Sequence, residues 1–143
     1  MSSPTQSYSP LLHLELNGDL SEIGRAAVQV QEFLRAHGCA ERVRSDCELI
    51  MVEACNNAIK HTDTQAKWQP VAVEVRIEPA QIEMRIIDHG PGFEWPQTAE
   101  LPRPEEESGR GVFLIRALTD DAAYLREPGK NVLVLRKKTG SAA

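Results

Sequence analysis

The sequence lacks the long apolar runs and the excess of basic residues that would place a protein in a membrane or on nucleic acid. No apolar stretch in its 143 residues approaches the length of a membrane span. The N-terminal MSSPTQSYSP has neither a basic region nor an apolar core, so we expect no secretory signal. The formal net charge of −5 gives no support for direct nucleic-acid binding. We therefore expect a cytoplasmic protein with no direct contact to membranes or nucleic acid.

Cysteine is also scarce, and the spacing of the three cysteines argues against a disulfide and against a metal site. Cys39, Cys47 and Cys55 are an odd number, which points to a reducing compartment. On one helix, Cys47 and Cys55 would be separated by about 12 Å of rise, too far for a disulfide. No CxxC or HxxxH spacing is present to hold a metal. We expect all three thiols to be core residues.

Two familiar phosphate-binding motifs are missing as well. Gly90-Pro91-Gly92 is not followed by the third glycine of a dinucleotide fingerprint. Gly129-Lys130 lacks the upstream glycine and the following Ser or Thr of a P-loop. The sequence therefore contains neither of these phosphate sites.

What is present is the composition of one globular domain. Hydrophobic residues at 41% and charged residues at 26% are ordinary, and the length suffices for a real core. Residues 1–10 are rich in Ser and Pro, so we expect a disordered tail there. We expect a single domain over residues 11–137 and a frayed tail over 138–143.

The first third of the chain predicts a strand followed by a helix. Leucines that alternate with polar residues over residues 12–16 are typical of a half-buried strand. Asp19, with Glu22 three residues later, forms a capping-box pattern that predicts a helix start. That helix has apolar residues at steps of three and four and ends near Gly38.

The stretch Glu48 to His61, ELIMVEACNNAIKH, predicts a second helix with two distinct faces. Two adjacent asparagines are poor helix formers, so helix propensity does not explain them. Taken alone, their stripe also fits an ordinary solvent-exposed face. The apolar stripe is Val43, Cys47, Ile50, Met51, Ala54 and Ala58, and the neighbouring polar stripe is Glu53, Asn56, Asn57 and Lys60.

Two hairpins separated by a loop and a helix are predicted in the second half. Residues 71–77 and 82–86 alternate apolar with charged side chains around a Pro-containing break. Residues 89–108 hold four prolines and two glycines without periodicity, and a loop that long is usually functional or mobile. Helical character resumes at 109–118, and a last hairpin turns around Pro128–Asn131.

This order of elements predicts an α/β (α+β) sandwich. A mixed, mainly antiparallel sheet would carry helices on one face. A doubly wound parallel fold would need strands that alternate with crossover helices, and the two hairpins argue against it.

Three segments carry the candidate chemistry. The first is the Glu53/Asn57 face. The second, Asp88 to Phe93, lies at a strand end, where glycines permit close backbone approach and a carboxylate can accept a hydrogen bond from an exocyclic amine. The third, Ser108-Gly109-Arg110-Gly111, precedes a helix whose free N–H groups and positive dipole end form an anion site. Each glycine segment alone also serves as an ordinary turn.

Together the three segments resemble a known family. EACNNAIKH resembles the N box, DHGPGF the first glycine box and SGRGVFLI the second glycine box of the Bergerat-fold (GHKL) nucleotide-binding domains of gyrase, Hsp90, histidine kinase and MutL type. The short chain and the E-A-x-x-N-A-x-x-H spelling of the N box most resemble anti-sigma-factor serine/threonine protein kinases of the RsbW and SpoIIAB type. The resemblance covers residues 11–137.

The resemblance implies ATP and Mg²⁺ as cofactors. Asn57 would offer its amide oxygen to Mg²⁺, and Asp88 would receive the adenine amino group. Glu53, one helical turn before Asn57, would accept the proton of the substrate hydroxyl as the catalytic base. The second glycine box would close over the phosphates as a lid. The implied nucleotide-binding residues are Asn57, Lys60, His61, Asp88, Gly90, Gly92, Phe93, Ser108, Gly109, Arg110, Gly111 and Val112.

One feature departs from the family pattern. Glu105-Glu106-Glu107 precedes the second glycine box, where a basic residue would suit a triphosphate better. Arg110 is the only cation in that box, so the γ-phosphate contact is assigned to it. The resemblance further implies a STAS-type anti-anti-sigma protein as substrate, a sigma factor as captured partner, and a homodimer.

Other interpretations share the fold. A histidine-kinase catalytic fragment would need a helical dimerisation segment with an acceptor histidine, and none of the four histidines lies in such a helix. Of these, His13 and His37 have no acidic or metal-binding context, and we expect both at the surface. Gyrase- and Hsp90-type ATPases add further domains, for which 143 residues leave no room. A non-catalytic module that binds ATP stays open, because intact Glu53 and Asn57 argue against lost chemistry without excluding it.

Overall fold

The computed structural model describes residues 9–17, 19–60, 69–92 and 107–140, with the backbone alone for 107–110. The order of helices and strands is the predicted one. In chain order they are β1 (Leu11–Leu16), α1 (Ser21–Ala36), α2 (Glu41–Lys60), β2 (Val71–Glu78), β3 (Gln81–Asp88), α3 (Glu107–Leu118), β4 (Asp121–Glu127) and β5 (Lys130–Lys138).

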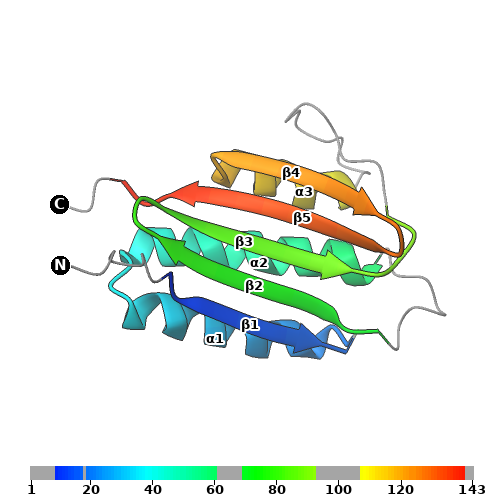
Figure 1. The fold of residues 1–143 in the computed structure, drawn as a ribbon, viewed down its shortest axis with the longest axis horizontal. Helices are drawn as coiled ribbons and strands as arrows, with labels where there is room; N and C mark the ends of the chain where they lie inside the picture. The colour runs from blue at the N-terminus through cyan, green and yellow to red at the C-terminus, as the bar shows by residue number, and fades with distance from the viewer. Residues whose placement is uncertain (1–8, 18, 61–68, 93–106, 141–143) are drawn as a thin grey trace, which may run out of the picture.

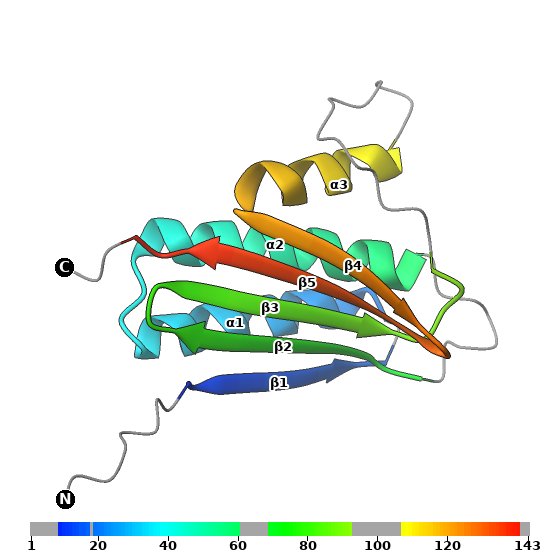
Figure 2. The same ribbon diagram turned by 45° about the horizontal axis from the view of Figure 1, so that its top comes forward.

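The described strands pair into one sheet in the order β1-β2-β3-β5-β4 (Figure 1). All four of these pairings are antiparallel. Helices α1, α2 and α3 lie on the same side of the sheet, as the turned view in Figure 2 shows. The predicted sandwich with helices on one face is confirmed, and so are both hairpins, while the described strands form an antiparallel sheet and not a mixed one.

The core lies between the helices and the inner face of the sheet. On β2 and β3 alternate residues point into it, so that Val73 lies opposite Ile86 and Val75 opposite Met84. Full burial of a side chain of this size contributes about 1.5–3 kcal/mol, and a one-residue slip would lose it, which fixes the register. The predicted Val43 is partly buried against this core. The helices bury the apolar residues Ile23, Ala26, Ala27, Val30, Leu34, Cys47, Ile50, Met51, Ala54 and Ala58.

The cysteines are free thiols, as predicted. Cys47 and Cys55 are fully buried, and burial raises the pKa of both thiols to about 12. At neutral pH both therefore stay protonated and unreactive. Cys39 is partly buried at the margin of the core.

The start of α1 differs from the prediction. The helix begins at Ser21, and Asp19 is not its N-cap. The Asp19 carboxylate accepts a hydrogen bond from the Ser21 N–H at 3.0 Å, and the Glu22 carboxylate accepts one from the Asn17 N–H at 2.6 Å. The two acids thus accept backbone hydrogen bonds in the turn before the helix and form no capping box.

Among the described residues, no helix combines the length and apolarity needed to cross a lipid bilayer.

The end of the chain also differs from the prediction. Strand β5 continues to Lys138, which lies opposite Gln81, and the Thr139 N–H donates to the Ala80 carbonyl at 3.1 Å. The expectation of a frayed tail is therefore wrong for residues 138 and 139, because backbone pairing with the β2–β3 turn holds them. Residues 141–143 lie outside the described residues.

Lys137 fixes α3 relative to the rest of the fold. Its Nζ lies 3.1 Å from Asp46 Oδ2 on α2 and donates to the Leu118 carbonyl at the end of α3, at 2.8 Å. A cation at a helix C-terminus also interacts favourably with the helix dipole. This contact holds the end of α3 against α2, and so helps set where the start of α3 lies.

His13 lies between two glutamates on the outer face of the sheet. Its Nδ1 is 3.1 Å from Glu74 Oε2, and its Nε2 is 3.3 Å from Glu15 Oε2. The hydrogen bonds to Glu15 and then Glu74 raise the pKa of His13 above 6.5. The surface location is confirmed. The expected lack of an acidic context is wrong, because the β1–β2 register places His13 opposite Glu74.

This contact predicts a small pH dependence of stability. Because the pKa is raised in the folded protein, the stabilisation is full below pH 6.5 and is lost as the pH rises through the folded value. The side chain is 46% exposed, so solvent screening keeps the effect below about 1 kcal/mol. An NMR titration should give a His13 pKa above 6.5, and Glu15→Gln should lower it. An unchanged value in that variant would contradict the pairing.

Candidate functional site

The three predicted segments meet at one end of the molecule. The C-terminal ends of α2 and β3 and the N-terminal end of α3 lie at the same end in Figures 1 and 2. Glu53 and Asn57 are on α2, Asp88 ends β3, and α3 begins at Glu107. The antiparallel sheet and the position of α3 thus gather residues that are far apart in the sequence.

Glu53 and Asn57 face the first turns of α3. They are one helical turn apart, so their side chains share one face of α2. A Cβ built on Gly111 would lie 2.9 Å from Glu53 Oε2, and 3.4 and 3.5 Å from Nδ2 and Oδ1 of Asn57. Glycine at position 111 therefore lets α3 approach these two polar groups closely.

The Asn57 side chain is buried but incompletely hydrogen-bonded. It is 6% exposed, and its Nδ2 finds no hydrogen-bond partner within the described part of the chain. A buried donor without a partner costs about 1–3 kcal/mol, and native proteins keep few of them. The Nδ2 donor would therefore gain a partner from a ligand oxygen placed between α2 and α3.

Helix α3 begins earlier than predicted. The pattern predicts helical character from residue 109 with the anion site just ahead of the helix, whereas α3 begins at Glu107 and contains the whole segment Ser108–Gly111. Packing of Gly111 against α2 overrides the poor helix propensity of glycine. The first four N–H groups of a helix have no acceptor within it, so residues 107–110 still present the donors that an anion site requires.

Asp88 is buried and oriented by two donors. It is 7% exposed, and its Oδ1 accepts hydrogen bonds from the Gly90 N–H at 3.0 Å and from Asn131 Nδ2 at 2.9 Å. Asn131 Nδ2 also donates to the Gly90 carbonyl at 3.0 Å. No donor from the described ranges is bonded to Oδ2, which leaves this oxygen to accept a ligand amine.

Two residues of this site are not marked by any of the sequence motifs. Asn131 was placed in a turn, but it lies in β5 opposite Asp88 and is 3% exposed. No period-two pattern locates it, because residues 132–135 are all apolar and all buried, so alternation does not mark the inner face of β5. Arg126 donates from Nη2 to the Pro91 carbonyl at 2.5 Å, and no sequence signal distinguishes it from other surface arginines.

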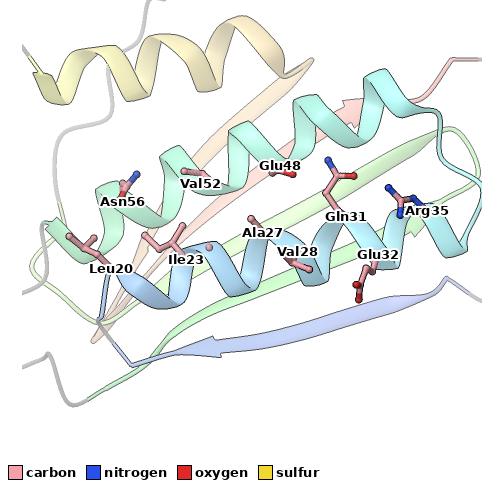
Figure 3. Close-up of a pocket in the computed structure, with 11 residues that line it drawn as sticks. Leu20, Ile23, Ala27, Val28, Gln31, Glu32, Arg35, Glu48, Val52 and Asn56 are labelled. Carbon is pink, nitrogen blue, oxygen red and sulfur yellow. The ribbon is translucent and has the colours of Figure 1, made fainter.

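Asn56 does not join Glu53 and Asn57, although the helical spacing grouped them. Adjacent helical residues point about 100° apart, and Asn56 lines a groove of about 610 Å³ between α1 and α2. Figure 3 shows Asn56, Val52 and Glu48 along the side of α2 that faces α1. The predicted polar stripe is therefore divided between two faces of the helix.

Other predicted nucleotide-binding residues lie at the end of α2, in α3 or outside the described residues. Lys60 is exposed at the end of α2, and Val112, which is part of α3, is buried. His61 and Phe93 lie outside the described residues. Ser108, Gly109 and Arg110 are described by their backbone alone, in the first turn of α3.

These groups suit a nucleotide and a magnesium ion. The Asn57 amide can present its oxygen to a hard cation, and the Glu53 carboxylate adds negative charge beside it. Proteins often hold Mg²⁺ through one or two side chains together with substrate phosphates. The free N–H groups at the start of α3 suit the phosphates. The cofactors implied by the resemblance therefore fit the residues present.

The chain belongs to the histidine kinase-like ATPase domain family, whose sequence profile matches residues 16–137. The matched range runs from the end of β1 into β5 and includes all three boxes. The family assignment made from the motifs is therefore confirmed, and ATP binding is the property that the family name implies.

Among characterised proteins, the chain is similar to serine-protein kinases. The chain is 22% identical over 150 residues to the serine-protein kinase RsbW of Bacillus subtilis, covering 98% of this chain and 85% of that protein. It is 26% identical over 100 residues to the serine-protein kinase RsbW of Listeria innocua, covering 64% of each. The resemblance to kinases of the RsbW type is confirmed at this low identity.

Solved structures support the fold. The structure of the RsbU and RsbW domains of Rv1364c from Mycobacterium tuberculosis matches with a TM-score of 0.70 at 19% identity, over 90% of this chain and 32% of that chain. The SiaB–SiaC complex from Pseudomonas aeruginosa matches with a TM-score of 0.55 at 12% identity, over 89% of both chains. At these identities the likeness concerns the fold alone.

Proposed function

We propose that this protein is an ATP- and Mg²⁺-dependent serine/threonine protein kinase and anti-sigma factor. It phosphorylates a serine or threonine hydroxyl of a small STAS-type anti-anti-sigma protein. Phosphorylation releases this antagonist, and the protein then holds a sigma factor away from RNA polymerase. The proposed partners are cytoplasmic, so the proposal places the protein there, and it includes a homodimer.

One observation carries the proposal that the site performs chemistry. Glu53 and the incompletely bonded Asn57 converge on Gly111, at a helix start that offers free N–H groups. A carboxylate at this point is suited to accept the proton of a substrate hydroxyl. The serine-protein kinase relatives support the same reaction type, and the solved SiaB–SiaC complex supports a small protein partner.

In the proposed reaction, each side chain has a separate task. ATP transfers its γ-phosphoryl group to the substrate hydroxyl and leaves as ADP. Asn57 would hold a Mg²⁺ ion, which would neutralise phosphate charge. Glu53 accepts the proton of the substrate hydroxyl, since a neutral hydroxyl is a poor nucleophile. Asp88 Oδ2 accepts the adenine amino group, and the N–H groups at the start of α3 bind phosphate oxygens.

The role of Asp88 can be tested by base selectivity. Asp88→Asn should weaken ATP binding about ten- to a hundredfold, because a hydrogen bond to a charged group contributes about 1.5–3 kcal/mol. Titration calorimetry with ATP and GTP, each with Mg²⁺, measures both affinities. Equal affinity of the unaltered protein for the two nucleotides would refute the adenine contact.

The packing of Gly111 predicts a second result. Gly111→Ala would place a methyl group 2.9 Å from Glu53 Oε2, so the carboxylate must move. The flexible side chain can shift, so the protein should stay folded while phosphoryl transfer falls at least tenfold. Gly24→Ala on α1 is the matched control, since a Cβ there meets nothing within 4 Å. It should leave transfer unchanged and raise stability by about 0.5–1 kcal/mol. Equal transfer by the two variants would contradict the proposed packing role.

The partners can be tested by affinity capture from a cell extract with and without ATP, followed by mass spectrometry. Recovery of a sigma factor together with a small STAS-type protein would support the proposed switch. Recovery of neither protein would favour a non-catalytic module that regulates another partner.

A further inference from the structure

The turn end of the β4–β5 hairpin is bonded to the segment that follows Asp88. Asn131 Nδ2 donates to the Gly90 carbonyl at 3.0 Å, and Arg126 Nη2 donates to the Pro91 carbonyl at 2.5 Å. His89 Nδ1 lies 3.1 Å from the Gly129 carbonyl. Figure 2 shows the chain leaving β3 beside this hairpin. The first glycine box is thus held by residues about 40 positions later in the chain.

Asn131 has one orientation that satisfies its neighbours. It is 3% exposed, and both hydrogens of its Nδ2 face acceptors, namely Asp88 Oδ1 and the Gly90 carbonyl. A flipped amide would set its oxygen against both of these oxygens, and buried polar groups need partners. The hydrogen-bond network therefore fixes the amide with its nitrogen toward Asp88.

The same network fixes which oxygen of Asp88 can meet a ligand. Oδ1 already accepts two hydrogen bonds, from the Gly90 N–H and from Asn131. Oδ2 accepts none from the residues that the structure describes. Without Asn131, Oδ1 would lose a donor inside a buried site, and the carboxylate could turn toward other partners.

Gly92 and Arg126 fit each other. Gly92 has a φ of +81°, and a Cβ on it would lie 2.8 Å from Arg126 Nε and 3.0 Å from Asn131 Oδ1. A side chain at position 92 is therefore excluded by the two residues that hold the segment. Arg126 is an exposed residue whose guanidinium lies against this stretch of backbone.

We propose that Asn131 and Arg126 are positioning residues that set the base selectivity of the nucleotide site. They hold Asp88 Oδ2 and the Gly90–Gly92 backbone so that the site accepts the exocyclic amine of adenine. A purine with an exocyclic carbonyl would place its carbonyl oxygen next to Asp88 Oδ2. The two acceptors repel each other, so the site rejects such a base. The inference rests on the proposed ATP binding and adds two residues to it.

The test compares ATP and GTP affinities in Asn131→Ala, Arg126→Ala and the control Lys130→Ala. Lys130 lies in the same hairpin, and its Nζ is 3.8 Å from Glu127. Asn131→Ala should lower ATP affinity about ten- to a hundredfold and bring the ATP/GTP ratio close to one. Arg126→Ala should lower the ratio less and speed hydrogen exchange at the Gly90 amide. Lys130→Ala should leave the ratio unchanged, because a lost charge affects both triphosphates equally.

Asn131→Asp separates positioning from a merely structural role. Two carboxylates in contact repel unless they share a proton, so the aspartic acid can donate to Asp88 only at low pH. The ATP affinity of this variant relative to the unaltered protein should fall as the pH rises from 5 to 8. His89 and the ATP phosphates are common to both proteins, so the comparison removes their contributions.

The outcomes distinguish this inference from the proposed function. If the unaltered protein binds neither nucleotide, the ATP site is wrong and the inference falls with it. If the unaltered protein prefers ATP, and Asn131→Asp and Arg126→Ala keep that preference at every pH, only the positioning role is overturned. Arg126 is exposed, so its variant is expected to fold even if Asn131→Ala does not.

Discussion

Glu53→Gln is expected to lower phosphoryl transfer to the antagonist by about 10²–10⁴-fold, the usual range for a general base. The substitution keeps the size of the side chain and most of its hydrogen bonding but removes the basic oxygen. Glu53 Oε2 lies beside Gly111 and is proposed to act on the substrate hydroxyl, whereas Asn57 and Asp88 are proposed to bind the nucleotide. ATP binding and capture of the sigma factor should therefore persist. Radiolabel transfer from γ-labelled ATP, run beside a binding titration, measures both properties.

Glu48→Gln is the matched control for this experiment. Glu48 is on the same helix and lines the groove toward α1, away from the start of α3. Its variant should transfer phosphate at the normal rate. Near-normal transfer by Glu53→Gln would remove the general-base assignment and leave Glu53 with a structural role.

Asn57→Ala is expected to abolish Mg²⁺-dependent nucleotide binding and phosphoryl transfer together. The reason is that the amide supplies the oxygen proposed for Mg²⁺ in a buried position. The same variant removes the Nδ2 donor that has no partner in the described ranges. The nucleotide-free protein should therefore lose little stability or become up to about 1 kcal/mol more stable. Calorimetric titration with ATP and thermal unfolding without it measure the two effects.

Asn56→Ala is the control, because it makes the same substitution one residue earlier. Asn56 faces the groove between α1 and α2, so its variant should bind ATP normally. If Asn57→Ala loses several kcal/mol of stability and Asn56→Ala does not, Asn57 is a structural residue. In that case weaker ATP binding would follow from damage to the fold.

The sequence by itself determined the fold class and the three segments of the site. Period-two alternation in β2 and β3 and steps of three and four in α1 and α2 mark which faces are buried, and burial of apolar side chains dominates the energy. The N box and the glycine boxes carry residue types that their helices and strands do not explain, which is why they pointed to function.

Only the tertiary structure decided how these segments meet. Helical spacing groups Asn56 and Asn57 in one stripe. In the structure α1 and α3 pack on different sides of α2, so Asn56 faces the groove toward α1 and Asn57 faces α3. The sequence pattern predicts a helix from residue 109, whereas α3 begins at Glu107 and Gly111 packs closely against Glu53. Propensities act over a few residues, and contacts between distant elements override them.

The residues that hold Asp88 were decided in the same way. Asn131 reads locally as part of a turn, and Arg126 as one surface arginine among several. Their roles arise from the β3–β5 and β4–β5 registers, which set Asn131 opposite both Asp88 and Arg126. Strand pairing between segments about 40 residues apart leaves no local pattern, so the sequence predicts the Asp88 carboxylate as a candidate but not the residues that orient it.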